Sequence, residues 1–431
     1  MNPLCMLAAP AAPPPPGIDG LVSTLAARYR ERIVALQLPA DAKLRRVAVG
    51  AAIEAWLAED GPEDSLHDQL LARLVDELAG LGPLEPLLAD PQVSEILVNG
   101  TTSVYVEVDG NLQAASARFL DAEQLRSVIE RLLVGTGRRV DDGSPMVDAR
   151  LADGSRLNAV LPPVAVGAPL VTIRRPPRRR LAFDDLVAGG AVSRPAAAFL
   201  HAAVMGRCNI VVSGGTSTGK TTLLRALAAL VPAGQRLVVL EDVAELAIDH
   251  PHIASLECRP PGRDGGAEVT VHDLVRNSLR MRPDRIVVGE VRGPEAAPMV
   301  LAMNTGHEGS MTTLHANSAH DAVTRLESML AVAWPALAER TLRAWIAAAI
   351  DVIVHCERCA DGRRVVGDIA AIDSTPNGEL TATPVFRRDR RRDANIACDE
   401  VPRRCLERMA RNGVHAPVGL FASGAFATAE R

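Results

Sequence analysis

Aromatic residues are scarce in this sequence. Phenylalanine, tryptophan and tyrosine make up only 3% of its 431 residues, and proteins that hold single-stranded nucleic acid usually stack its bases on such rings. The formal net charge is −5, so no basic field covers the chain as it would in a general nucleic-acid coat. We therefore expect no direct contact with nucleic acid.

Long apolar runs are also missing. No stretch approaches the ~20 apolar residues that span a bilayer, and the longest candidate, Trp345–Val354, is interrupted by Asp351. The first residues, Leu4–Ala9, are apolar, but they lack a preceding basic segment and run into Pro13–Pro16, which is not typical of a secretory signal. The sequence predicts a cytoplasmic protein whose membrane role, if it has one, is peripheral.

The cysteines do not form a disulfide pattern. They number seven and are scattered along a large chain, which favours a reducing compartment. Cys356 and Cys359 could supply half of a zinc site, with Cys398 and Cys405 as the other half. This second pair is spaced too widely for a usual zinc knuckle or ribbon, so incidental thiols are the favoured interpretation.

One stretch matches a phosphate-binding motif, and the strand and helix patterns on either side of it are those that the motif requires. The residues that match G-x-x-x-x-G-K-[ST] are Gly214, Gly215, Thr216, Ser217, Thr218, Gly219, Lys220, Thr221 and Thr222. A β-branched segment precedes them and leucines at helical spacing follow, so strand, loop and helix N-terminus form an anion cradle. Lys220 would reach the β- and γ-phosphates and the Thr221 hydroxyl would hold Mg²⁺. We expect a site for ATP with Mg²⁺.

Helical and β-rich patterns alternate from Leu181 to about Asp373, which is typical of an α/β domain with a mainly parallel sheet. Polar residues follow its strand patterns: Glu241 and Asp242, Glu290, His315 and His355. Because ligands bind beyond the carboxyl ends of parallel strands, we expect the acidic pair, Glu290 and His315 to share one crevice with the phosphate loop.

Hydrolysis of the β–γ bond suggests a role for each residue of this crevice. Glu290 is placed to orient the attacking water or to hold a metal-bound water, and the alternative for it is a helix-capping carboxylate. Glu241 and Asp242 admit the same two interpretations, and we favour catalysis for Glu241 and a water-mediated Mg²⁺ contact for Asp242. His315 alone is often structural, but its position on this edge predicts a γ-phosphate sensor.

The rest of the chain contains a helical arm and a small α+β domain. Four strand patterns and one helical pattern lie between residues 87 and 175, where Arg150, Arg156, Arg174 and Arg175 are either surface charges or reach a triphosphate. The predicted divisions are a disordered tail 1–17, a helical arm 18–81, an α+β N-terminal domain 82–175, an Arg/Pro linker 176–183, a P-loop domain 184–385 and a polar tail 386–431.

Four motif blocks occur in order and extend beyond a phosphate loop. They are Ser213–Leu224 (SGGTSTGKTTLL), Leu240–Leu246 (LEDVAEL), Asp273–Gly293 (DLVRNSLRMRPDRIVVGEVRG) and Met303–Ala316 (MNTGHEGSMTTLHA). Over about residues 65–385 the chain strongly resembles the secretion ATPases of type II and type IV systems. Leu81–Gly100 (LGPLEPLLADPQVSEILVNG) resembles the N-terminal signature of the CpaF/TadA branch, which serves tight-adherence (Flp) pili.

The resemblance implies a RecA-like P-loop ATPase domain and a homohexameric ring at the cytoplasmic face of the inner membrane, with ATP bound between the two domains. It also implies inner-membrane platform proteins as partners, and through them pilin or a secreted substrate. Carried over by position, the family's functional residues are Lys220 and Thr221 (Walker A), Glu241 and Asp242 (Asp box), Glu290 (Walker B), His315 (His box), and Arg156 and Arg174 as the N-terminal-domain arginines that reach the phosphates.

Two departures from the family pattern are visible. Ser217-Thr218 replaces the commoner Gly-Ser. Ser217 must therefore adopt whatever backbone angle the family's glycine takes at this position, and glycine adopts unusual angles more easily than serine. The tetracysteine zinc element of the type II branch is missing, which favours the tight-adherence or VirB11-like branches.

We expect an ATP-hydrolysing motor for pilus assembly or protein secretion. The alternatives are a VirB11-like type IV secretion or conjugation ATPase, a nucleic-acid translocase, and a nucleotide-gated scaffold that binds ATP but barely hydrolyses it. The presence of Glu290 and Lys220 argues against the scaffold.

Overall fold

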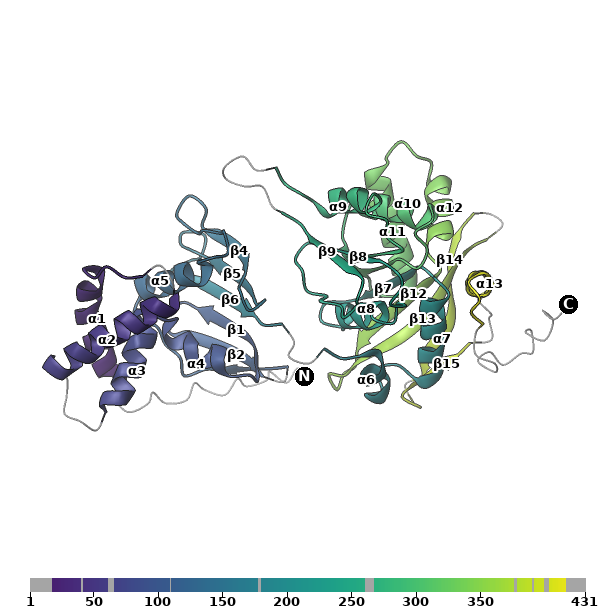
Figure 1. Ribbon diagram of the computed structural model, residues 1–431. Helices are drawn as coiled ribbons and strands as arrows, with labels where there is room; N and C mark the ends of the chain where they lie inside the picture. The colour runs from purple at the N-terminus through teal and green to yellow at the C-terminus, as the bar shows by residue number, and fades with distance from the viewer. Residues whose placement is uncertain are drawn as a thin grey trace. The chain divides into compact units, whose positions relative to one another are not determined.

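The computed structural model describes residues 18–39, 42–60, 66–108, 110–176, 180–259, 267–375, 378–389, 391–398 and 403–415. The chain divides into two compact units, Met1–Arg179 and Arg180–Arg431, and each is described by itself (Figure 1). The tail predicted to be disordered, 1–17, lies outside the described residues, as do 177–179 of the predicted linker and 416–431.

Three helices begin the first unit: α1 Ile18–Val34, α2 Ala42–Asp60 and α3 His67–Leu78. They form the helical arm that the apolar periodicity predicts. Their facing sides bury a core of their own, in which Tyr29, Ile53 and Leu74 are fully enclosed. A 3-10 turn, Gly82–Leu84, and a short helix, α4 Glu85–Ala89, then lead into a sheet.

This sheet has six strands in the order β3-β2-β1-β6-β5-β4, all antiparallel to their neighbours. They are β1 Val93–Asn99, β2 Ser103–Val108, β3 Asn111–Ala114, β4 Met146–Arg150, β5 Arg156–Val160 and β6 Leu170–Arg174. The helix α5, Ala122–Leu133, begins at its cap Asp121 and packs its apolar face on the sheet. Sequence reasoning missed β3 and β4 because both are short, largely exposed edge strands with little apolar alternation.

A nine-stranded sheet organises the second unit, in the order β15-β14-β13-β12-β7-β11-β10-β8-β9 (Figure 1). The block from β12 to β9 is parallel, as predicted, and β13 to β15 add antiparallel hairpins. The strands are β7 Ile210–Gly214, β8 Leu237–Glu241, β9 Ile253–Glu257, β10 Arg285–Val291, β11 Met311–His315, β12 Val352–Arg358, β13 Arg364–Ser374, β14 Leu380–Asp389 and β15 Ala394–Ala397.

Helices cover both faces of this sheet and give a three-layer α/β domain. They are α6 Phe183–Ala188, α7 Arg194–Met205, α8 Lys220–Ala228, α9 Val271–Ser278, α10 Ala296–Asn304, α11 Ala319–Ala333, α12 Glu339–Ala349 and α13 Arg403–Arg411. Neighbouring residues of β7 pack into the cores on opposite faces of the sheet. Val212 belongs to the core that contains residues of α7 and α8, and Val211 to the core that contains residues of α10 and α12. No described helix combines the length and apolarity needed to cross a membrane.

The end of the chain differs from the predicted polar tail 386–431. The predicted boundary falls inside β14, which continues to Asp389, and β15 and α13 follow it into the fold. Within the arginine-rich stretch that starts at Arg387, Arg388 pairs with Asp393 at 2.6 Å, and Asp393 also pairs with Arg363 of the β12–β13 hairpin at 2.5 Å. Arg363 lies 30 residues before Asp393 in the chain, so the local sequence alone looks like a solvated run of charges.

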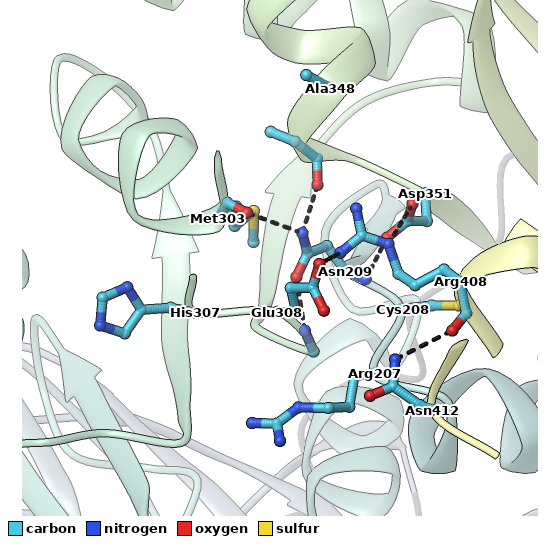
Figure 2. Close-up of polar contacts among 12 residues, drawn as sticks. Arg207, Cys208, Asn209, Met303, His307, Glu308, Ala348, Asp351, Arg408 and Asn412 are labelled. Carbon is cyan, nitrogen blue, oxygen red and sulfur yellow. Dashed lines mark hydrogen bonds and ion pairs between the residues drawn. The ribbon is translucent and has the colours of Figure 1, made fainter. Parts of the chain in front are cut away.

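Buried charges anchor α13 to the sheet (Figure 2). Arg408, only 6% exposed, places Nε 3.0 Å from Asp351 Oδ1 and Nη1 2.9 Å from Glu308 Oε1. Asp351 Oδ2 accepts from the backbone N–H of Asn209 at 2.7 Å, and Asn209 Oδ1 accepts from the N–H of Gly309. The C-terminal helix therefore holds the segments that enter β7, β11 and β12.

Candidate nucleotide site

The phosphate loop has an unusual backbone that its glycines allow. Gly214 has φ +154° and Gly219, directly before α8, has φ +95°. A Cβ on Gly214 would lie 2.5 Å from the carbonyl oxygen of Cys356 and 2.6 Å from Thr218 Oγ1, so no side chain fits there. Ser217 has φ +59°, the left-handed angle that glycine adopts without strain, as its departure from the family pattern predicts.

Lys220 begins α8 and is 8% exposed. Its Nζ donates to the carbonyl oxygen of Gly215 at 2.8 Å and lies 3.4 Å from His315 Nδ1. Burial lowers the pKa of Lys220, and the charge of Glu290 opposes that shift. The ammonium group therefore rests over its own loop, where the helix N-terminus favours anions.

Glu290 lies near the carboxyl end of β10 and faces the same point. One carboxylate oxygen, Oε2, lies 2.6 Å from Arg292 Nη2, and the other, Oε1, lies 2.8 Å from His315 Nε2. Oε1 is buried, and its contact with His315 Nε2 does not have the geometry of a hydrogen bond. A buried acceptor without a well-aligned hydrogen bond is costly in a protein interior, so this oxygen is a candidate contact for a polar ligand or water.

His315, at the end of β11, stands between Lys220 and Glu290. An ammonium group can only donate, so Nδ1 is the acceptor and the ring proton is on Nε2, facing Glu290. Burial is the largest cause that lowers the pKa of His315, and the positive charge of Lys220 adds to it. The ring is therefore neutral near pH 7.

The two acidic residues after β8 lie in different environments. Glu241 is 5% exposed and its Oε1 accepts from the backbone N–H of Glu245 at 2.8 Å and of Leu246 at 2.9 Å. Burial raises its pKa, and these two hydrogen bonds act against that shift. Its carboxylate thus shapes the turn that carries Asp242, whereas Asp242 is exposed. The pKa of Arg292 is raised chiefly by its hydrogen bond to Glu290, and the charge of Asp242 adds to that shift.

The residues present fit Mg²⁺ held with a nucleotide. Thr221 is exposed on the first turn of α8, and Glu290 offers Oε1, whose contact with His315 does not have hydrogen-bond geometry. Among the described side chains, no group of three or more His, Cys, Asp and Glu could hold a metal ion, so phosphate oxygens and water must complete any Mg²⁺ shell.

The six described cysteines are free thiols, and burial raises the pKa of Cys356 to about 12.

The two candidate arginines lie together in the first unit. Arg156 on β5 stands directly opposite Arg174 on β6, and residues paired in this way point to the same face of a sheet. Because the first unit is described by itself, their contact with the nucleotide stays a prediction.

A cavity of about 210 Å³ adjoins the phosphate loop at Thr218, Gly219 and Thr222. Sequence reasoning did not anticipate it, because α6 and the β12–β13 hairpin, which are far apart in the chain, supply its walls. The other residues that line it are Leu181, Asp185, Leu186, Gly189, Ala191, Val192, Leu223, Cys356, Arg364, Val365 and Val366.

Two further residues at the site were missed. Arg292 follows Glu290 by two positions, and the alternation of a strand puts such residues on one side. His355 was listed only as a strand-end residue, and it packs beneath the loop with Nδ1 3.0 Å from Ser213 Oγ. Burial lowers the pKa of His355, which is typical of a structural histidine.

Residues 77–412 match the family model described as "Type II/IV secretion system protein". The chain belongs to this family. A protein of Mycobacterium tuberculosis (strain H37Rv) named for conjugal transfer is 42% identical over 325 residues, which are 74% of this chain and 91% of that protein. Conjugal transfer protein TrbB of Rhizobium radiobacter is 36% identical over 304 residues, 69% of this chain and 89% of TrbB.

Among solved structures, the crystal structure of the VirB11 ATPase from the Brucella suis type IV secretion system, in complex with sulphate, is 32% identical in sequence. The match has a TM-score of 0.38 and covers 69% of this chain and 93% of that chain. The family match confirms the resemblance to type II and type IV secretion ATPases. It does not separate the CpaF/TadA branch from the VirB11-like branch.

Proposed function

We propose that this secretion ATPase is a hexameric ring motor that hydrolyses ATP to power pilus assembly or protein secretion across a bacterial inner membrane. The arrangement of Lys220, His315 and Glu290 at the head of the phosphate loop carries the proposal. A cation for phosphate, a neutral imidazole and a carboxylate that can accept from water are the groups that phosphoryl transfer to water needs.

In this mechanism a phosphate oxygen replaces the Gly215 carbonyl as the acceptor for Lys220 Nζ. Glu290 Oε1 orients a water molecule, whose oxygen bonds to the γ-phosphorus while the bond to the bridging β-phosphate oxygen breaks, and the water proton moves to the carboxylate. His315 senses the γ-phosphate because it touches both Lys220 and Glu290. Mg²⁺, held by the Thr221 hydroxyl and through water by Asp242, would neutralise charge on the phosphates.

The nucleoside would occupy the cavity beside Thr222. Its apolar residues, Leu186 and Val365 among them, suit the faces of a purine, and the carboxylate of Asp185 can accept from an exocyclic amine or a ribose hydroxyl. Arg364 would cover the nucleoside from the β13 side, since its side chain passes close to Gly219.

Mechanical output would come from the first unit. Closure over MgATP would bring Arg156 and Arg174 to the phosphates, and reopening after hydrolysis would move a partner. The cross-strand pairing of these arginines supports this role, because it presents two cations together. We place the ring at the cytoplasmic face of the inner membrane, where platform proteins pass its motion to pilin or to a secreted substrate.

The names of the relatives favour a second candidate, a VirB11-like ATPase of a type IV secretion or conjugation system. Its chemistry would be the same and its cargo different, so genes for pilins or for conjugation proteins beside this one would separate the two. A nucleic-acid translocase would instead need DNA-stimulated turnover, and a net charge of −5 with 3% aromatic residues argues against it.

The deciding experiment is steady-state ATP hydrolysis on size-fractionated protein, wild type against Glu290→Gln. We expect a hexamer-sized fraction of the wild type to hydrolyse ATP, and the variant to bind nucleotide with at least about 100-fold slower turnover. The matched control is Glu339→Gln, an exposed residue on α12, which should keep wild-type turnover. Wild-type turnover in Glu290→Gln would refute the role of that residue, and a monomer without turnover would favour a scaffold.

A further inference from the structure

Two cysteines from distant parts of the second unit meet in its core. Cys208 lies in the turn between α7 and β7, and Cys405 lies in the first turn of α13. Their Sγ atoms are 3.3 Å apart, although the residues stand 197 positions apart in the chain. Cys208 is fully buried and Cys405 is 2% exposed. The contact therefore joins the C-terminal helix to the strand that leads into the phosphate loop.

Backbone packing fixes the approach of the two thiols. Gly206, at the end of α7, lies so close to α13 that a Cβ on this glycine would be 2.6 Å from Met409 Cγ. Just after α13, Asn412 Nδ2 donates to the carbonyl oxygen of Gly206 at 3.2 Å. The buried pair of Arg408 and Asp351 holds the same helix (Figure 2). The sulfur contact thus follows from how the two segments pack and not from side-chain rotamers alone.

A disulfide is the bond that this geometry allows. Its sulfur atoms lie about 2.05 Å apart, so the two thiols, now at 3.3 Å, need only small side-chain rotations to bond. While α13 is packed, the hydrogen bond to Cys405 and burial hold the pKa of Cys208 well above its usual range. A neutral, enclosed thiol is a poor nucleophile. Oxidation therefore needs α13 to move away and return.

We propose that Cys208 and Cys405 form a reversible disulfide that locks α13 onto the second unit under oxidising conditions. In the reduced protein α13 is held by side-chain contacts alone and can detach, whereas in the oxidised protein it is tied covalently to the start of β7. In a reducing compartment the pair stays reduced, and the disulfides that do form there are usually transient and redox-sensing. The lock goes beyond the proposed motor, since neither cysteine belongs to the nucleotide site.

A small-molecule disulfide such as oxidised glutathione is the oxidant. When α13 moves out, the Cys405 thiolate attacks one sulfur of this disulfide, the S–S bond breaks, and one glutathione leaves with the proton of Cys405. When the helix returns, Cys208 attacks Cys405 Sγ, and the second glutathione leaves with the proton of Cys208. Both cysteines are oxidised, and the oxidised glutathione takes up their two electrons and two protons.

The lock acts where three strands of the nucleotide-binding sheet begin. The backbone N–H of Asn209, next to Cys208, donates to Asp351 Oδ2 at 2.7 Å, and Asn209 Oδ1 accepts from the N–H of Gly309 at 2.8 Å. These residues precede β7, β12 and β11, of which β7 leads into the phosphate loop and β11 ends at His315. A covalently held α13 therefore keeps the frame of the site together when the protein is heated.

Disulfide mapping of the full chain tests the pair. The protein is incubated with oxidised glutathione, its remaining thiols are blocked with iodoacetamide, and it is digested with trypsin without reduction. Cleavage after arginine and lysine releases the fragments 208–220 and 405–408. We expect mass spectrometry to find these two fragments linked, and dithiothreitol to separate them. Absence of the linked fragments, or equal amounts of links from Cys208 to Cys359, would overturn the proposal.

Thermal unfolding tests the lock. The disulfide joins residues 197 positions apart and so constrains the unfolded chain, and the oxidised wild type should melt at least about 5 °C above the reduced protein. Cys405→Ala should melt at the same temperature in both states, and Cys208→Ala is an independent second variant. The matched control Cys359→Ala, a half-buried cysteine outside the pair, should keep the wild-type shift. No shift in the wild type, or a shift that survives in Cys405→Ala, would overturn the lock.

The rate of oxidation tests the movement of α13. Arg408→Met removes the cation that lies 3.0 Å from Asp351, so the helix should leave more often and the disulfide should form at least about tenfold faster. The control Arg404→Met loses a longer contact, 3.8 Å, and should stay near the wild-type rate. Equal rates in Arg408→Met and the wild type would overturn the opening step. None of these measurements uses ATP, so failure here and failure of the proposed motor are distinguishable.

Discussion

His315 links Lys220 to Glu290: Nδ1 of its ring lies 3.4 Å from Lys220 Nζ, and Nε2 lies 2.8 Å from Glu290 Oε1. The residue that would hold phosphate and the residue that would orient water thus meet through one neutral imidazole. A change in the charge of this ring would therefore alter its contacts with both Lys220 and Glu290.

ATP turnover should therefore depend on neutral His315. Burial and Lys220 lower its pKa from the ordinary 6.5, so the ring stays neutral until the pH falls below that value. We expect kcat to hold from pH 8 to about 6.5 and to fall at lower pH, because protonation removes the acceptor for Lys220. His315→Gln should lower kcat about 10²- to 10³-fold and remove this acid limb. An acid limb that persists in the variant would assign the titration to another group.

Gly214 and Gly215 offer a matched pair of substitutions in the phosphate loop. Gly214→Ala should abolish nucleotide binding, because its Cβ would lie 2.5 Å from a backbone oxygen. Gly215→Ala should keep binding within about tenfold, because the nearest atom to its Cβ is a methyl group 3.7 Å away. Equilibrium titration with a fluorescent ATP analogue measures both. Equal affinities would show that the loop backbone relaxes around the added methyl group.

The anchor of α13 should contribute strongly to stability. Arg408→Met leaves Asp351 buried without its closest cation, and we expect a loss of about 3–5 kcal/mol in the free energy of unfolding. The double variant Arg408→Met with Asp351→Asn removes both charges and should recover part of the loss. Urea denaturation measures each variant. The control is Arg404→Met, whose contact with Asp351 is longer, 3.8 Å, and which should cost about 1 kcal/mol or less.

Acidification should destabilise the fold through His355. Burial lowers the pKa of His355 below its ordinary 6.5 in the folded protein. At a pH between this lowered pKa and 6.5, the unfolded chain takes up a proton that the folded protein does not. The stability contribution is present above about pH 6.5 and is lost as the pH falls toward the lowered pKa. Tm measured at pH 7.5 and 5.5 should fall less in His355→Gln than in the wild type. An identical fall in both would exclude this histidine as a cause.

Local patterns of the sequence predicted the phosphate loop, the parallel strands and the edge at which their polar residues gather. These features are encoded within a few residues: β-branched runs end in glycine or a charged side chain, and the carboxyl ends of parallel strands must share one edge. The family resemblance rested on the same short motifs. For this reason Glu290 and His315 could be placed on one side of the sheet before their distance was known.

Only the tertiary structure decided which side chains meet there. The rotamers that bring His315 between Lys220 and Glu290, the turn that engages Glu241, and the cavity between α6 and β13 all depend on packing between distant segments. The C-terminal region shows the same limit, since Arg408 finds Asp351 and Glu308 far back in the chain. A charge in the sequence looks solvated until the fold supplies its partner, because burial and pairing are properties of the assembled core.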